Sequence, residues 1–222
     1  PLIVGTGTNN TQKALEYTKM AEEMGFDAAL VVTPYYNKPT QKGLYEHYKF
    51  LSEKTNIPML IYNVPGRTSV NILPDTVAQL AEIKNIIGIK EASGNLKQVS
   101  ELLMKCPKDF VVLSGDDFTA YPTVMLGGKG VISVAANIMP KEMAEFMEAS
   151  LNGDVKKAQE LHLKLYPLFK AMFIETNPVP AKAALWLMGK IETPEVRLPL
   201  AGLTDASLEQ LKKVLKEQYN LI

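Results

Sequence analysis

Residues 86–92 read Ile-Ile-Gly-Ile-Lys-Glu-Ala, an apolar run that ends in a lysine and a glutamate. Polar residues stand on both sides of it, Lys84-Asn85 before and Ser93-Gly94-Asn95 after. A short apolar run bounded in this way is typical of a strand buried on both faces, as in a parallel sheet. The stretch therefore predicts a buried strand that carries Lys90 close to its carboxyl end.

Apolar runs of the same kind recur through the first 139 residues, and each is followed by a segment with helical spacing. The six predicted strands are 2–6, 28–32, 59–63, 86–92, 110–114 and 131–135. Strands that alternate with helices predict an α/β fold with a parallel sheet and right-handed crossovers. No hairpin signal of the Asn-Gly type interrupts the alternation.

Beyond residue 139 the strand signals stop. Four helical stretches are expected there, at 140–151, 154–174, 179–189 and 205–219. We therefore expect a sheet domain over residues 1–139 and a C-terminal helical domain over residues 140–222.

Composition excludes several classes of function. The 222 residues include 24 Lys and Arg against 24 Asp and Glu, which predicts no electrostatic footprint for nucleic acid or an anionic membrane. A single cysteine, Cys106, favours a reducing, cytoplasmic setting. The two histidines, His47 and His162, lack metal-ligand spacing, and Gly5-Thr6-Gly7 lacks the rest of a nucleotide-binding pattern. We expect neither a metal nor a cofactor.

Lys90 is the first candidate for chemistry. Lysine is rarely buried without a partner, and (β/α) barrels keep their active sites at the carboxyl ends of their strands. Desolvation lowers the pKa of an amine, and the neutral amine can attack a carbonyl to form a Schiff base. The alternative is that the long side chain of Lys90 only extends from the strand end into water.

Other polar residues follow neighbouring strands at the same end. They are Tyr35 and Tyr36 after the second strand, Tyr62 and Arg67 at and after the third, and Asp116 and Asp117 after the fifth. A buried tyrosine hydroxyl can carry the protons that Schiff-base formation needs, and an arginine can bind a carboxylate with two hydrogen bonds.

Each of these residues also has a simpler interpretation. Taken alone, Tyr62 is better explained as a core aromatic residue whose hydroxyl reaches water, and Arg67 is consistent with a solvated loop charge. For Asp116 and Asp117 we favour the interpretation that they cap the following helix.

Six stretches together carry a family resemblance. They are 32–39 (Val-Thr-Pro-Tyr-Tyr-Asn-Lys-Pro), 62–68 (Tyr-Asn-Val-Pro-Gly-Arg-Thr), 87–95 (Ile-Gly-Ile-Lys-Glu-Ala-Ser-Gly-Asn), 113–117 (Leu-Ser-Gly-Asp-Asp), 130–134 (Gly-Val-Ile-Ser-Val) and 175–178 (Glu-Thr-Asn-Pro). In this order they resemble the dihydrodipicolinate synthase family, whose relatives are N-acetylneuraminate lyase and 2-keto-3-deoxy sugar-acid aldolases. The resemblance runs over essentially the whole chain.

The resemblance implies a lyase that condenses pyruvate with aspartate semialdehyde in lysine and diaminopimelate biosynthesis. It also implies self-association as a dimer or tetramer. The implied site residues are Lys90 as the Schiff-base lysine, Tyr62 as proton shuttle, Tyr36 reaching across the dimer interface, Arg67 on the semialdehyde carboxylate, and Gly115 and the Ile132 backbone along the pocket.

One departure from the family concerns the front of the barrel. The family's barrel has eight strands, and this sequence starts at what resembles the third. We therefore expect a truncated TIM (β/α) barrel of six strands that lacks the first two βα units and their Gly-Thr-Thr-Gly-Glu stretch, with reduced activity. Two alternatives stay open: a promiscuous pyruvate aldolase, and a catalytically weak or dead remnant.

Overall fold

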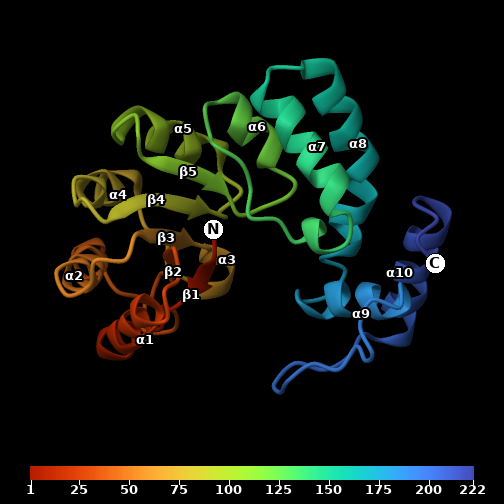
Figure 1. The fold of residues 1–222 in the computed structure, drawn as a ribbon, viewed down its shortest axis with the longest axis horizontal. Helices are drawn as coiled ribbons and strands as arrows, with labels where there is room; N and C mark the ends of the chain where they lie inside the picture. Colours follow the sequence, from red (N-terminus) through yellow and green to blue (C-terminus); the bar gives the residue numbers. More distant parts are fainter. The chain divides into compact units, whose positions relative to one another are not determined.

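The computed structural model describes residues 1–222. Five parallel strands form one sheet in chain order (Figure 1), and consecutive strands are hydrogen-bonded neighbours. The strands are β1 (Ile3–Gly5), β2 (Ala28–Val32), β3 (Met59–Asn63), β4 (Ile86–Glu91) and β5 (Val111–Ser114). The predicted alternation and the parallel sheet are confirmed.

Helices connect the successive strands and cover one face of the sheet. The connecting helices are α1 (Thr11–Glu23), α2 (Gln41–Ser52), α3 (Pro65–Thr68), α4 (Pro74–Ala81) and α5 (Leu96–Lys105), and α6 (Ala120–Met125) follows β5. Helix α1 lies beside α2, α2 beside α4, and α4 beside α5 (Figure 1). Side-chain N-caps fix where three of them begin: Asn10 for α1, Thr40 for α2 and Asn95 for α5.

Two rows of side chains across the sheet separate the core from the opposite face. Register partners Val31, Ile61, Ile89 and Val112 belong to the hydrophobic core and are buried. Because side chains alternate along a strand, the next row points away from this core. That row starts at Val32 and is described with the candidate site.

The sixth predicted strand, 131–135, is wrong. Only Val131 pairs, through a single parallel bridge to Ser114. The Ser133 hydroxyl then accepts a hydrogen bond from the Ala136 backbone N–H at 2.9 Å, and the chain enters a 3₁₀ turn at Ala135–Asn137. The segment has the apolar residues that a strand needs, but a strand must also pair with a neighbour along its length. Here the Ser133 hydroxyl gives the backbone a local hydrogen bond instead.

The chain divides into two compact units, Pro1–Ile132 and Ser133–Ile222. The second unit contains α7 (Pro140–Leu151), α8 (Val155–Ala171), α9 (Val179–Leu187) and α10 (Asp205–Glu217), so the four predicted helical stretches are confirmed. The division into domains at residue 139 stays a prediction. None of the helices combines the length and the apolar character needed to span a bilayer.

Candidate active site

The candidate site is built on the sheet face opposite the core. Val32, Tyr62, Lys90 and Leu113 are register partners across β2, β3, β4 and β5. Adjacent strands of a sheet lie about 4.8 Å apart, so Tyr62 and Lys90 are immediate neighbours. The Lys90 Nζ atom lies 4.1 Å from the centre of the Tyr62 ring, a cation–π distance.

Half-burial of Lys90 governs its protonation. Burial lowers the pKa of the Lys90 amine below its ordinary value, and the nearby Arg67 charge lowers it further, whereas the Asp117 carboxylate raises it. The net direction is downward, so a larger share of Lys90 is neutral at a given pH than for a lysine in water. A neutral amine is the form that attacks carbonyl carbon.

Tyr62 is protonated at neutral pH. Burial raises the pKa of its phenol above the ordinary value, and the Arg67 charge opposes this rise. The hydroxyl is therefore available both to donate a proton and to accept one in return.

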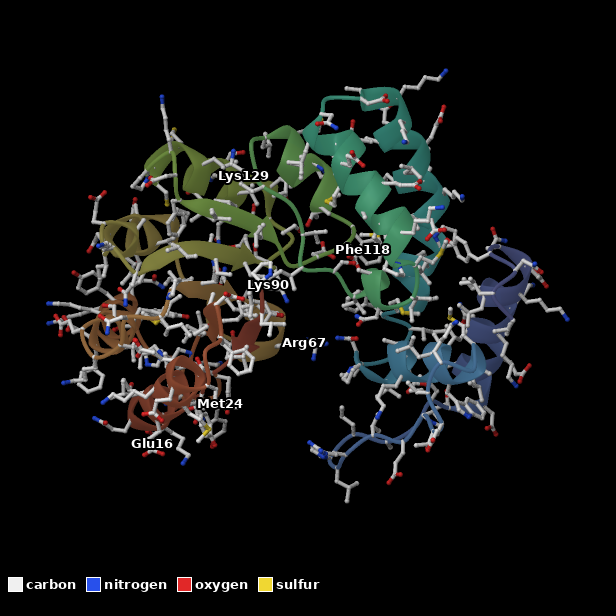
Figure 2. The ribbon with its side chains drawn as sticks, in the orientation of Figure 1. Glu16, Met24, Arg67, Lys90, Phe118 and Lys129 are labelled. Atoms are coloured by element: carbon white, nitrogen blue, oxygen red, sulfur yellow. The ribbon has the colours of Figure 1, made fainter.

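Arg67 is positioned by the short helix α3. Pro65 opens this helix, and the Arg67 N–H donates to the Val64 carbonyl at 2.9 Å. The buried Thr68 hydroxyl donates to the Val70 carbonyl at 3.0 Å. Figure 2 shows Lys90 from β4 and Arg67 from α3 at the same end of the sheet, with the Arg67 side chain exposed.

A cavity of about 350 Å³ lies beside Tyr62 and Arg67. Its walls come from β1, β2, β3 and the loops after them. The lining residues are Gly5, Gly7, Leu30, Val32, Tyr35, Tyr62, Val64, Arg67 and Thr68. The cavity thus offers an apolar wall, the two phenols of Tyr35 and Tyr62 and one guanidinium, which suits a small organic carboxylate.

Gly115 lies directly against Lys90. Its N–H donates to the Glu91 carbonyl at 2.7 Å. A Cβ atom at this position would lie 2.8 Å from Lys90 Cε and 2.7 Å from Ala92 Cβ, closer than carbon atoms approach. Only glycine leaves room for the Lys90 chain in this position. Ile132, the other predicted pocket residue, is half-buried, and its N–H donates to the Ser114 carbonyl at 2.9 Å.

Tyr35 and Tyr36 have different surroundings. Tyr35 lines the cavity, whereas Tyr36 is 87% exposed and has a backbone φ of 72°. The left-handed region is strained for a residue with a Cβ atom. The loop is held by the Asn37 amide, which donates to the Asn9 carbonyl at 2.9 Å. Within this chain the structure therefore groups Tyr62, Arg67, Lys90 and Gly115, and leaves Tyr36 outside the group.

Comparison with known proteins shows the family of the chain. The profile of the "Dihydrodipicolinate synthetase family" matches residues 1–218. The chain belongs to this family. It is 60% identical over 216 residues to the 4-hydroxy-tetrahydrodipicolinate synthase of Thermodesulfovibrio yellowstonii. The aligned residues cover 97% of this chain and 74% of that relative.

Solved structures of family members superpose closely. The dihydrodipicolinate synthase of Thermotoga maritima matches with a TM-score of 0.97 and 49% identity, over 100% of this chain and 76% of that one. The synthase of Acinetobacter baumannii, solved in complex with pyruvate, matches with a TM-score of 0.95 and 47% identity, over 98% and 75% of the two chains. The chain spans about three quarters of the length of these family members.

The two consecutive aspartates, Asp116 and Asp117, have different surroundings that the sequence did not reveal. The capping interpretation is wrong, because α6 begins at Ala120 with Thr119 as its N-cap residue and no side-chain cap bond. Asp116 instead accepts hydrogen bonds from the Phe118 N–H at 3.3 Å and the Thr119 hydroxyl at 2.9 Å, in the turn that precedes this helix. Asp117 is instead only 1% exposed, and its charge acts on Lys90. Two consecutive aspartates after a buried strand were the available signal, but pattern alone does not say which one turns inward.

Proposed function

We propose that this chain is a Schiff-base lyase that condenses pyruvate with aspartate semialdehyde, the 4-hydroxy-tetrahydrodipicolinate synthase reaction of lysine and diaminopimelate biosynthesis. The observation that carries the proposal is the half-buried Lys90 amine, 4.1 Å from the centre of the Tyr62 ring. The family membership and the names of the relatives support the same reaction. The single cysteine supports a reducing compartment, the cytoplasm.

Lys90 and Tyr62 divide the first half of the chemistry. The neutral Lys90 amine attacks the keto carbon of pyruvate, and the resulting carbinolamine loses water to leave the imine. Tyr62 gives a proton to the departing oxygen and takes one back, since its phenol is protonated at the outset. The iminium form acidifies the adjacent methyl group, which loses a proton to give the enamine. The enamine attacks the aldehyde carbon of the second substrate, and the aldehyde oxygen takes up a proton. The amine of the second substrate then attacks the iminium carbon, which closes the ring and expels the Lys90 amine.

Arg67 binds the carboxylate of aspartate semialdehyde in this proposal. It lines the cavity together with Tyr62, so a carboxylate held there leaves the aldehyde carbon close to Tyr62 and Lys90. Gly115 and the Ile132 backbone form the wall on the β5 side. The close approach of Gly115 to Lys90 and the Ile132 bond to Ser114 support this assignment.

We further propose that the sheet is part of a (β/α) barrel and that the chain self-associates as a dimer or tetramer. Tyr36, exposed and held in a strained conformation, would reach into the site of a neighbouring copy. Sedimentation at micromolar concentration tests this, and a cooperatively melting monomer would refute it.

Borohydride reduction in the presence of pyruvate tests the central proposal. The pyruvate imine is reduced to a stable secondary amine, and peptide mass mapping should find the label on Lys90 and none in Lys90→Ala. Label on another lysine, retained in Lys90→Ala, would refute the assignment. Aspartate semialdehyde and sugar-derived aldehydes offered as second substrates then separate a synthase from a general pyruvate aldolase.

A further inference from the structure

A buried polar network lies behind the candidate site, on the helix-facing side of the sheet. Asn63 and Glu91 are register partners, each one residue beyond Tyr62 or Lys90, and they are 0% and 3% exposed. Glu91 Oε2 accepts from the Asn63 amide at 2.9 Å and from the Gln98 amide at 3.0 Å. Glu91 Oε1 accepts from the Ser93 N–H at 2.7 Å. The carboxylate is thus satisfied by neutral donors.

The same network holds the far end of the segment that carries Arg67. The Asn63 amide also donates to Asn71 Oδ1 at 2.7 Å, and Asn63 Oδ1 accepts from the Ile72 N–H at 3.2 Å. Asn71 Nδ2 donates to Gln98 Oε1 at 2.9 Å. Residues 64–72 therefore leave the sheet at Asn63 and return to it, and Arg67 lies inside this closed segment.

The hydrogen bonds define one orientation of the Asn63 amide. Its oxygen is used by the Ile72 N–H and its nitrogen by Asn71 and Glu91. Rotating the amide by half a turn would place donor against donor at Ile72 and acceptor against acceptor at Glu91. Residues 64–72 are therefore held in one position relative to the sheet.

We propose that the Asn63–Asn71–Glu91–Gln98 network is a positioning device that sets where Arg67 stands, and so governs recognition of the second, carboxylate-bearing substrate. The inference rests on the proposed function, in which Arg67 binds that carboxylate. Lys90 depends on the network less directly, because it is part of β4 and its place is set by pairing with β3 and β5. Loss of Asn71 should therefore affect the second substrate and spare imine formation.

Asn71→Ala is the test variant and Asn85→Ala is its matched control. Both asparagines are half-buried. Asn85 stands at the other end of β4 and donates to the Ser52 and Thr55 carbonyls at 3.2 and 2.9 Å. The two variants lose the same side chain: Asn71 gives up its bonds to the Asn63 and Gln98 side chains, and Asn85 its bonds to two backbone carbonyls. Only the loss of Asn71 releases the Arg67 segment.

Three quantities are measured on the full chain: the melting temperature, the borohydride-trapped pyruvate at Lys90, and the KM for aspartate semialdehyde. In Asn71→Ala the KM should rise on the order of tenfold, the factor that corresponds to the net free energy of one hydrogen bond. Pyruvate trapping should stay within about twofold of the parent. Asn85→Ala should leave both values at the parent level.

The inference is overturned when Asn71→Ala keeps the parent KM, when trapping and condensation fall by the same factor, or when Asn85→Ala raises the KM equally. An equal fall of trapping and condensation would show that less of the protein is folded, and an equal rise of KM in Asn85→Ala would show a general loosening of the fold. Absence of pyruvate label in the parent chain is a different outcome, since it refutes the proposed function and this inference with it.

Discussion

Replacement of Gly115 by alanine tests how Lys90 is held. In the native structure the added Cβ atom would lie 2.8 Å from Lys90 Cε and 3.0 Å from Lys90 Cγ. Ordinary carbon–carbon contact is about 3.5 Å, so one of the two partners must move by roughly 0.7 Å. The added Cβ atom would also lie 2.7 Å from Ala92 Cβ, an atom that moves only with its backbone. Relief of that overlap needs a small backbone shift, and relief of the overlap with Lys90 displaces the flexible lysine chain.

Displacement of the amine should slow imine formation much more than it unfolds the protein. A misplacement of about 1 Å at a reacting group can cost on the order of 100-fold in rate, whereas overpacking by one methyl costs roughly 1–3 kcal/mol of stability. The assay is the rate of borohydride trapping of pyruvate at Lys90, with urea unfolding measured on the same preparation. We expect at least tenfold slower trapping in a folded Gly115→Ala protein, on the scale of that positional effect.

Two glycine-to-alanine controls separate the causes. At Gly128 the added Cβ would lie 2.7 Å from Thr123 Cγ2, an overlap of the same size away from Lys90. At Gly202 it would meet nothing within 4 Å. Gly128→Ala should lose stability and keep the trapping rate per folded molecule, and Gly202→Ala should keep both. Parent-like trapping by folded Gly115→Ala would refute the reasoning.

Three further predictions concern titration and buried charge. Because burial lowers the pKa of Lys90, the trapping rate should reach half its maximum below pH 10.5, and Asp117→Asn should move that midpoint lower still, since Asp117 raises the pKa; a midpoint at 10.5 or above contradicts this. Burial lowers the pKa of His47 from 6.5 to about 4, so the unfolded chain binds its proton first as the pH falls. Stability should be full above about pH 6.5 and fall by about 2 kcal/mol at pH 5, and His47→Gln should remove that slope in urea unfolding. Glu91→Gln replaces a carboxylate that accepts from two amide donors with a group that is itself half donor, and it should lower the free energy of unfolding by about 1–3 kcal/mol. The exposed control Glu82→Gln should change the free energy of unfolding by less than about 0.5 kcal/mol. Equal effects of the two substitutions in urea unfolding would contradict this.

Much of the order of strands and helices could be predicted, because it depends on the hydrophobic pattern within each segment. Residues 28–32 and 59–63 are strands as expected, since apolar runs bounded by turn residues need little more than burial to become strands. The same pattern at 131–135 failed, because Val131 pairs with Ser114 alone. Strand pairing is a relation between two segments, and the apolar pattern of one segment does not contain it.

The candidate site divides in the same way. The adjacency of Tyr62 and Lys90 was predictable, because successive strands of an alternating α/β chain tend to be neighbours. The separate environments of Tyr35 and Tyr36, and of Asp116 and Asp117, were not. Each pair is two identical residues in a row, and the backbone turn that sends one inward and the other outward depends on contacts made elsewhere in the chain.

The sequence by itself determined the order of elements, the end of the sheet at which the polar residues gather, and the lysine that carries the proposed chemistry. Only the tertiary structure decided that Gly115 lies against Lys90 and that Asn71 joins Asn63, Glu91 and Gln98. Hydrophobic periodicity is a local property that acts over one element at a time. Close approach and hydrogen-bond partnership join residues far apart in the chain, and they exist only once the strands and helices have been packed together.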